Sequence, residues 1–158
     1  MQTFLPYTDL HKSVAVLDRQ RLGKQRVETY QILKALLTTQ GLHGGWARHP
    51  ASRMWEGYEL ALLKYQEETC KEWVDVRGYK DTCWLKSYNL FNNEDKEKYA
   101  AGDYVFPSWF GSEDFHKAHQ SNLVRKAPEI YGSLFPDVED DLPYIWPGLS
   151  LEEAKLKQ

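Results

Sequence analysis

Cysteine is scarce in this sequence, which contains two, Cys70 and Cys83. Their separation does not match the spacing of metal-ligating cysteine pairs, so we expect two free thiols. No run of about 18 apolar residues is present, which excludes an ordinary transmembrane helix and a membrane partner. The first residues lack a basic stretch followed by an apolar one. No signal peptide is therefore predicted, and the expected location is the cytoplasm.

An excess of positive charge is also missing. The formal net charge is −3 over 158 residues, which excludes a broadly basic nucleic-acid-binding surface. The charge is uneven, however, because residues 19–26 are basic and residues 137–141 are acidic. This pattern is compatible with a local basic groove. The chain also lacks a phosphate-binding glycine-rich loop, a dinucleotide-binding fingerprint and a nucleophile elbow.

Strand-like alternation of apolar and polar residues is absent as well, and helical periodicity dominates. The chain is long enough for one domain with a substantial core. We therefore expect a mainly α fold, a compact helical bundle formed by residues 1–148, with a frayed tail at residues 149–158. Residues 130–147 are rich in proline and aromatic side chains. We expect them to pack over the helices as a C-terminal strap.

Apolar spacing and helix-ending residues give the expected helices. They cover residues 14–37, residues 54–77 with Gly78 as the stop, residues 83–90, and residues 113–126. Residues 92–98 are polar and are expected to form a surface excursion.

The predicted helix at residues 14–37 carries polar residues on its apolar face. At ~100° per residue, four of them share the sector of the buried leucines: Asp18, Arg21, Gln25 and Glu28. Their spacing stacks them along one side of the helix. Because unpaired buried charge is costly, they form either a paired network inside the core or the floor of a polar cleft. The outward side carries a basic flank suited to phosphates, formed by Arg19, Lys24 and Arg26.

Three stretches suggest a family. The first is the run Arg21-Leu22-Gly23-Lys24. The second is an aromatic-rich helix that follows His49 and closes at Arg77-Gly78-Tyr79-Lys80-Asp81-Thr82. The third is His119-Gln120-Ser121-Asn122-Leu123-Val124-Arg125-Lys126, followed by Pro128 and Tyr131-Gly132. In order and in motif these stretches resemble the pyrimidine-dimer DNA glycosylase family, also called phage endonuclease V. The resemblance implies a compact all-α domain and a role in DNA repair without a cofactor.

The resemblance also implies a mechanism. In that family the N-terminal α-amine attacks the sugar C1′ to form a Schiff base, and a glutamate of the first helix assists. An α-amine has a pKa of ~7.7–8.0, so part of it is neutral and nucleophilic near pH 7. Here residue 2 is Gln2, whose bulk normally prevents removal of Met1, so the amine would be that of Met1. Arg21 occupies the place of the glutamate, and Asp18 or Glu28 is expected to replace it, oriented by Arg21.

The expected ligand is double-stranded DNA carrying a damaged or modified base. Phosphates would be bound by Arg19, Lys24, Arg26, Arg125 and Lys126. An extruded base would stack on Trp46, Trp55 or Tyr58. Further residues expected at the DNA-binding surface are Gln25, Arg48, His49, Arg53, His119 and Asn122. His49 either braces its loop or lies in the cleft. His116 and His119 have no evident third partner for zinc, and the chemistry requires no metal.

Two other functions fit the same residues. A non-catalytic DNA-binding module would explain the missing glutamate and the missing small residue at position 2. An enzyme acting on a nucleotide, nucleoside or other small glycoside would fit the negative net charge better than a duplex-binding protein does. The sequence does not indicate the oligomeric state.

Overall fold

The computed structural model describes residues 2–38 and 48–147, and every regular element within these ranges is helical. The expectation of a mainly α fold is therefore confirmed. Met1, Trp46 and the expected tail lie outside the described residues. The elements are α1 (Leu10–Ala15), α2 (Arg19–Leu37), α4 (Pro50–Arg53), α5 (Glu59–Lys71), the π-helix η2 (Glu72–Val76), α6 (Cys83–Tyr88), α7 (Asn93–Ala101), α8 (Glu113–Lys126) and α9 (Pro128–Tyr131). In the described part of the chain, none of them has the length and apolar character needed to cross a membrane.

The expected single helix at residues 14–37 is in fact two helices, α1 and α2. Asp18 interrupts it as the N-cap of α2, with an extended backbone and a carboxylate that accepts from the Arg21 N–H at 3.3 Å. The guanidinium of Arg77 donates to the carbonyl oxygens of Ala15 and Leu17 at 3.2 and 2.6 Å. The Asp18 cap on α2 and the Arg77 hydrogen bonds to the residues before it therefore both stabilise the break between the two helices. Aspartate is a strongly preferred N-cap, and this signal was present in the sequence.

One further boundary differs from expectation. The helix expected at residues 54–77 does not begin until Glu59, because Gly57 has a φ of +86° that ends the preceding turn. Residues 92–98, expected as a polar surface excursion, form the N-cap and first turns of α7, a helix without buried residues, and the Asn92 side chain caps it by accepting from the Asp95 N–H at 2.8 Å. The helix predicted at residues 113–126 is confirmed as α8.

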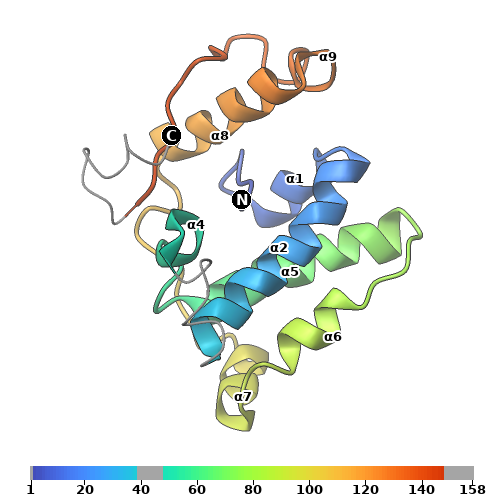
Figure 1. Cartoon of the computed structure of the whole chain (residues 1–158), viewed down its shortest axis with the longest axis vertical. Coiled ribbons are helices and arrows are strands. Elements are labelled where there is room, and N and C mark those ends of the chain that lie inside the picture. The colour runs from blue at the N-terminus through green and yellow to red at the C-terminus, as the bar shows by residue number, and fades with distance from the viewer. Residues whose placement is uncertain (1, 39–47, 148–158) are drawn as a thin grey trace.

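Residues 2–7 form an extended N-terminal segment that runs between α8 and α2 (Figure 1). From α8, the Nδ1 of His119 accepts from the Leu5 N–H at 2.9 Å. The Nδ1 of His116 lies 2.7 Å from the Leu5 carbonyl oxygen, and its Nε2 accepts from the Gly111 N–H, so Nδ1 is the donor. Gln120 donates to the Pro6 carbonyl oxygen at 2.7 Å. Side chains of one helix thus satisfy a buried stretch of backbone that has no strand partner.

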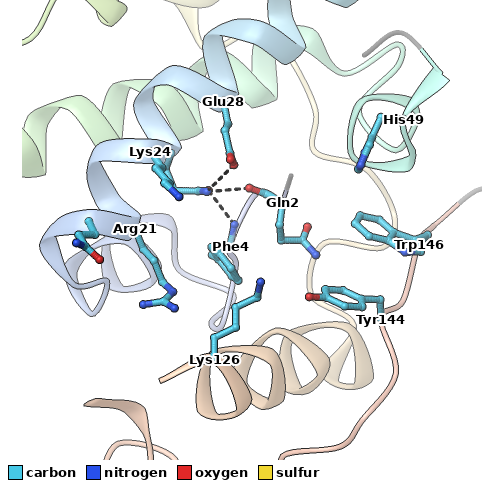
Figure 2. A pocket seen from close by; sticks show the side chains of 11 residues that line it. Gln2, Phe4, Arg21, Lys24, Glu28, His49, Lys126, Tyr144 and Trp146 are labelled. Carbon is cyan, nitrogen blue, oxygen red and sulfur yellow. Dashed lines mark hydrogen bonds between the residues drawn. The ribbon is translucent and has the colours of Figure 1, made fainter. Parts of the chain in front are cut away.

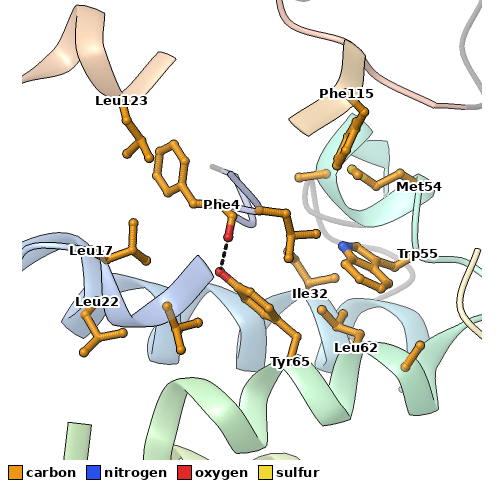
Figure 3. Packing of buried hydrophobic residues seen from close by; sticks show 14 of the residues in the cluster. Phe4, Leu17, Leu22, Ile32, Met54, Trp55, Leu62, Tyr65, Phe115 and Leu123 are labelled. Carbon is orange, nitrogen blue, oxygen red and sulfur yellow. Dashed lines mark hydrogen bonds between the residues drawn. The ribbon is translucent and has the colours of Figure 1, made fainter. Parts of the chain in front are cut away.

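An apolar core surrounds this segment. Phe4 and Leu5 are buried in one cluster with side chains of α2, α5 and α8. Figure 3 shows Phe4 between Leu123 of α8 and Tyr65 of α5, whose hydroxyl donates to the Phe4 carbonyl oxygen at 2.9 Å. The N-terminal segment is therefore an integral layer of the core. Both cysteines are buried free thiols, as predicted.

The two histidines of α8 should make stability depend on pH. Burial lowers the pKa of His119 to about 3 and also lowers that of His116, so both rings are neutral in the folded protein near pH 7. Between about pH 6.5 and the folded pKa values, the unfolded chain binds more protons than the folded one. The contribution of the two histidines to the free energy of unfolding should therefore be fully present above about pH 6.5. It should decrease as the pH falls below that value. The slope is up to about 1.4 kcal/mol per pH unit for each histidine.

Urea unfolding at about pH 7.5 and at about pH 5.5 measures this loss of stability. Both pH values lie above the range in which carboxylates titrate. The matched variant is His119→Asn, whose amide oxygen can still accept from the Leu5 N–H but does not titrate. It should lose less stability than the wild type over the same interval. A wild-type protein that is equally stable at both pH values would contradict the assignment of two neutral histidines.

Candidate functional site

A polar cleft opens where α2, the N-terminal segment, α8 and the C-terminal strap meet (Figure 2). Its volume is ≈ 350 Å³. It is lined by Gln2, Phe4, Gln20, Arg21, Lys24, Gln25, Glu28, His49, Lys126, Tyr144 and Trp146. These residues come from both ends of the chain and from its middle, so the cleft exists only in the complete fold.

Gln25 of α2 connects the floor of the cleft to the N-terminal segment. Its side chain is 1% exposed. Its amide nitrogen donates to the Gln2 carbonyl oxygen at 2.8 Å and lies 3.4 Å from the Glu28 carboxylate. Its amide oxygen accepts from the Phe4 N–H at 3.0 Å and from the Tyr65 hydroxyl, 2.7 Å away. The polar residues of α2 therefore form a buried network that is also a cleft floor, so both of the expected arrangements occur together.

Asp18, the other expected catalytic carboxylate, is not among the cleft-lining residues. It accepts from the Tyr131 hydroxyl at 2.5 Å and pairs with the Arg21 guanidinium at 3.1 Å. Burial opposes ionisation of the carboxyl, but the hydrogen bonds from Tyr131 and Arg21 outweigh it and keep the pKa of Asp18 below its usual value. Asp18 thus stays charged and links the start of α2 to α9.

Three cations surround the cleft. Arg21 and Lys24 project from α2, and Lys126 points into the cleft from α8 on the opposite side (Figure 2). Among the described residues that line the cleft, Glu28 supplies the one carboxylate. The resulting field is positive around a single negative group. Such a site attracts a polyanion and leaves a carboxylate facing it.

The C-terminal strap closes one side of the cleft with aromatic rings. Tyr144 and Trp146 stack with centroids 5.5 Å apart and an angle of 9°, and the His49 ring meets Trp146 edge-on at 6.0 Å. The strap is held against α8, because the Leu142 N–H donates to the Ser121 hydroxyl at 3.0 Å. The sequence predicted that a strap packs over the helices but did not assign Tyr144, Trp146 or Gln2 to the site.

His49 fulfils both of the roles considered for it. Its Nδ1 accepts from the Ala51 N–H at 3.0 Å, so it caps α4. Its ring also lines the cleft.

Two expected base or phosphate contacts are unavailable. Trp55 is 0% exposed, and its indole N–H donates to the Thr3 hydroxyl at 3.1 Å, so its ring cannot stack on an extruded base. Arg26 does not extend the basic flank. Its guanidinium pairs with Asp81 at 2.5 Å and lies 4.3 Å from the centre of the Trp73 ring. In both cases contacts made in the folded protein bury or pair a side chain that local sequence reasoning placed at the surface.

Three residues of α8 that were expected at the DNA-binding surface make contacts that support the fold. His119 holds Leu5, and Asn122 is buried and accepts from the Arg125 guanidinium. Arg125 also donates to the carbonyl oxygens of Asp140 and Leu142 at 3.3 and 3.2 Å, so it fastens the strap. Lys126 is the one expected α8 residue that lines the cleft.

The remaining expected contacts lie outside the cleft. Arg19 is exposed and lies 5.8 Å from the Tyr79 ring centre, in a shallow groove on the outer face of α2. Tyr58 lines a separate pocket between α5 and α7. Arg48 and Arg53 are exposed. Within the described residues, no group of three or more histidine, cysteine or acidic side chains is placed to hold a metal ion.

Comparison with known families gives a match over residues 1–87 to the family model described as pyrimidine dimer DNA glycosylase. The match covers just over half of the 158 residues. The chain belongs to the pyrimidine dimer DNA glycosylase family. No curated protein and no solved structure matches it. The part that matches the glycosylase family contains Gln2, Gln25 and Glu28, whereas α8 and the strap lie beyond it.

Proposed function

We propose that this protein is a DNA glycosylase that cleaves the glycosidic bond of a damaged pyrimidine in double-stranded DNA, and that the reaction takes place in the polar cleft. One observation carries the proposal. The Gln25 amide, which holds the Gln2 carbonyl oxygen, also lies 3.4 Å from the Glu28 carboxylate. A carboxylate therefore lies beside the N-terminal segment in a cleft with cationic walls. Membership of the glycosylase family supports the same assignment.

Glu28 is the carboxylate proposed to act on the sugar. When the bond between C1′ and the base nitrogen breaks, its electron pair leaves with the base and positive charge develops at C1′. A fixed carboxylate stabilises that charge without reorganisation. Asp18 is less suited to this role, since Tyr131 and Arg21 already occupy its oxygens outside the cleft.

A nucleophile must then form a bond to C1′ and lose a proton. Two are proposed: the α-amine of Met1, which gives a Schiff base, and water, which gives an abasic site. The amine route makes the protein a glycosylase with abasic-site lyase activity, and the water route makes it a glycosylase alone.

The cationic residues would position the duplex. Lys24 and Lys126 lie on opposite walls of the cleft, where they can neutralise phosphates on either side of the reacting sugar. The Arg21 guanidinium pairs with the Asp18 carboxylate at 3.1 Å, so the positive charge of Arg21 is partly balanced. The positive charge is thus local, in keeping with a net charge of −3.

The test uses a duplex carrying one pyrimidine dimer and the identical undamaged duplex. Glycosidic cleavage, measured as an alkali-sensitive break at the lesion, is expected for the first and not for the second. Borohydride is added in parallel. An adduct mapped to Met1 identifies amine chemistry, whereas cleavage without an adduct identifies water. Salt-sensitive binding of both duplexes without cleavage would overturn the proposal in favour of a binding module.

A further inference from the structure

Tyr65 is a fully buried residue of α5 whose hydroxyl reaches the network behind the cleft, although its side chain does not line the cleft. The hydroxyl donates to the Phe4 carbonyl oxygen at 2.9 Å (Figure 3) and lies 2.7 Å from the Gln25 amide oxygen. One hydroxyl proton therefore serves two acceptors. Burial and the nearby Glu28 carboxylate both raise the pKa of Tyr65, so this proton stays in place near pH 7.

The two ends of the Gln25 amide have different partners. The oxygen accepts from the Phe4 N–H at 3.0 Å and from the Tyr65 hydroxyl. The nitrogen faces the Gln2 carbonyl oxygen at 2.8 Å and the Glu28 carboxylate at 3.4 Å. An amide turned end for end would place its oxygen against these two acceptors and its nitrogen against the Phe4 N–H. The hydrogen-bond pattern therefore permits one orientation of the amide.

Tyr65 differs from the other partners of Gln25 in its place in the fold. Gln2 and Phe4 belong to the N-terminal segment, and Glu28 lies on α2, the helix of Gln25 itself. Of the Gln25 partners in the described structure, Tyr65 alone comes from another helix, and its ring is part of the apolar core. Its hydroxyl therefore fixes the amide relative to the core. Without that hydroxyl, Gln25 is held only by its own helix and by a segment that it holds in place itself.

We propose that Tyr65 is a positioning residue for glycosidic cleavage, which acts through Gln25 to hold the Glu28 carboxylate in place. The inference rests on the proposed function, because Glu28 is the carboxylate proposed there to stabilise the charge at C1′. A carboxylate that is already fixed stabilises this charge without reorganising during the reaction. Tyr65 itself contacts neither the DNA nor the reacting atoms. Its hydroxyl thus contributes to the rate of cleavage and not to DNA binding.

The test is Tyr65→Phe, which removes the hydroxyl and keeps the buried ring. On the duplex with one pyrimidine dimer, the single-turnover cleavage rate at saturating enzyme should fall about tenfold. The enzyme concentration that gives half of this rate should stay within about twofold of wild type, because the cations that face the DNA are unchanged. Cleavage at the wild-type rate by Tyr65→Phe would overturn the inference and leave the proposed function standing.

Tyr131→Phe is the matched control. Tyr131 is also fully buried, and its hydroxyl donates to Asp18, which lies outside the cleft. This variant should lower the urea midpoint by an amount similar to that for Tyr65→Phe, but its cleavage rate per folded molecule should stay within about twofold of wild type. An equal loss of cleavage in both variants would attribute the effect to general destabilisation and overturn the inference.

A double-mutant cycle with Glu28→Gln tests whether the effect passes through the carboxylate. Once the Glu28 charge has been removed, Tyr65→Phe should change the remaining cleavage rate by less than about twofold. The same tenfold loss in both backgrounds, flagged here as about tenfold, would show that Tyr65 does not act through Glu28.

A further readout does not require cleavage. Exchange of the Gln25 side-chain amide protons with water is followed by NMR. Exchange should be at least about tenfold faster in Tyr65→Phe than in wild type, and within about twofold of wild type in Tyr131→Phe. Unchanged exchange in Tyr65→Phe would show that the hydroxyl does not hold Gln25. If the wild type does not cleave the dimer duplex, the proposed function fails, and this exchange measurement still decides whether Tyr65 fixes the amide.

Discussion

Replacing Glu28 with glutamine is expected to lower the rate of glycosidic cleavage by about 10²- to 10³-fold while the protein remains folded. The substitution removes the negative charge that would face the developing cation at C1′. The new amide oxygen can still accept from Gln25, which lies 3.4 Å from the present carboxylate. The free energy of unfolding should therefore change by less than about 1 kcal/mol. Single-turnover cleavage and urea unfolding measure the two effects separately.

Asp18→Asn is the matched control, because Asp18 is the other carboxylate on the same side of α2. Asparagine is as good an N-cap as aspartate, but the change removes the ion pair with Arg21 and the charged acceptor of the Tyr131 hydroxyl, so it should destabilise the protein by about 1–3 kcal/mol. Cleavage per folded molecule should stay near the wild-type rate. The opposite pattern, with Asp18→Asn inactive and Glu28→Gln active, would assign the reaction to Asp18.

Gln25→Leu is expected to be the most destabilising single change near the cleft. It leaves the Gln2 carbonyl oxygen and the Phe4 N–H without the partners they now have at 2.8 and 3.0 Å. Each buried group that loses its partner costs about 1–3 kcal/mol, so a total of about 3 kcal/mol or more is expected. Cleavage should fall as well, because the N-terminal segment is no longer held beside Glu28.

The urea midpoint and hydrogen exchange at the Phe4 amide report this change. Gln31→Leu is the control on the same helix, because Gln31 is half-buried and lies outside the network around Gln25. It should change the unfolding free energy by less than about 0.5 kcal/mol. Equal exchange of the Phe4 amide in wild type and Gln25→Leu would show that Gln25 does not hold the N-terminal segment.

The polar face of α2 was predictable because it depends on local geometry. Once Arg21, Gln25 and Glu28 lie on one helix, their spacing places them on one side, and burial requires that they be paired. The bounds of α8 were predictable for the same reason, since Ser112, an acidic first turn and Pro128 are all near in sequence.

The rest of the cleft depends on contacts between distant residues. Nothing near Gln2 in the sequence indicates that its carbonyl oxygen meets Gln25, and nothing near Tyr144 indicates that the strap lies against α8. Trp55 illustrates the converse. An aromatic residue suits a stacking role in isolation, but its burial against Thr3 is decided by the whole fold. Helical periodicity identifies the buried face of a helix, not the element that covers it.

The N-terminal segment has a consequence for biosynthesis. Leu5 leaves the ribosome early, yet the two histidines that hold its backbone lie 111 and 114 residues later in the chain. Phe4 and Leu5 therefore cannot form their native contacts until α8 has been translated. Until then they are exposed or only transiently covered. Contacts of such long separation form slowly, and apolar surface exposed meanwhile promotes aggregation. The residues made first are thus among the last to reach their native positions, and nascent chains that end before α8 should depend most on chaperones.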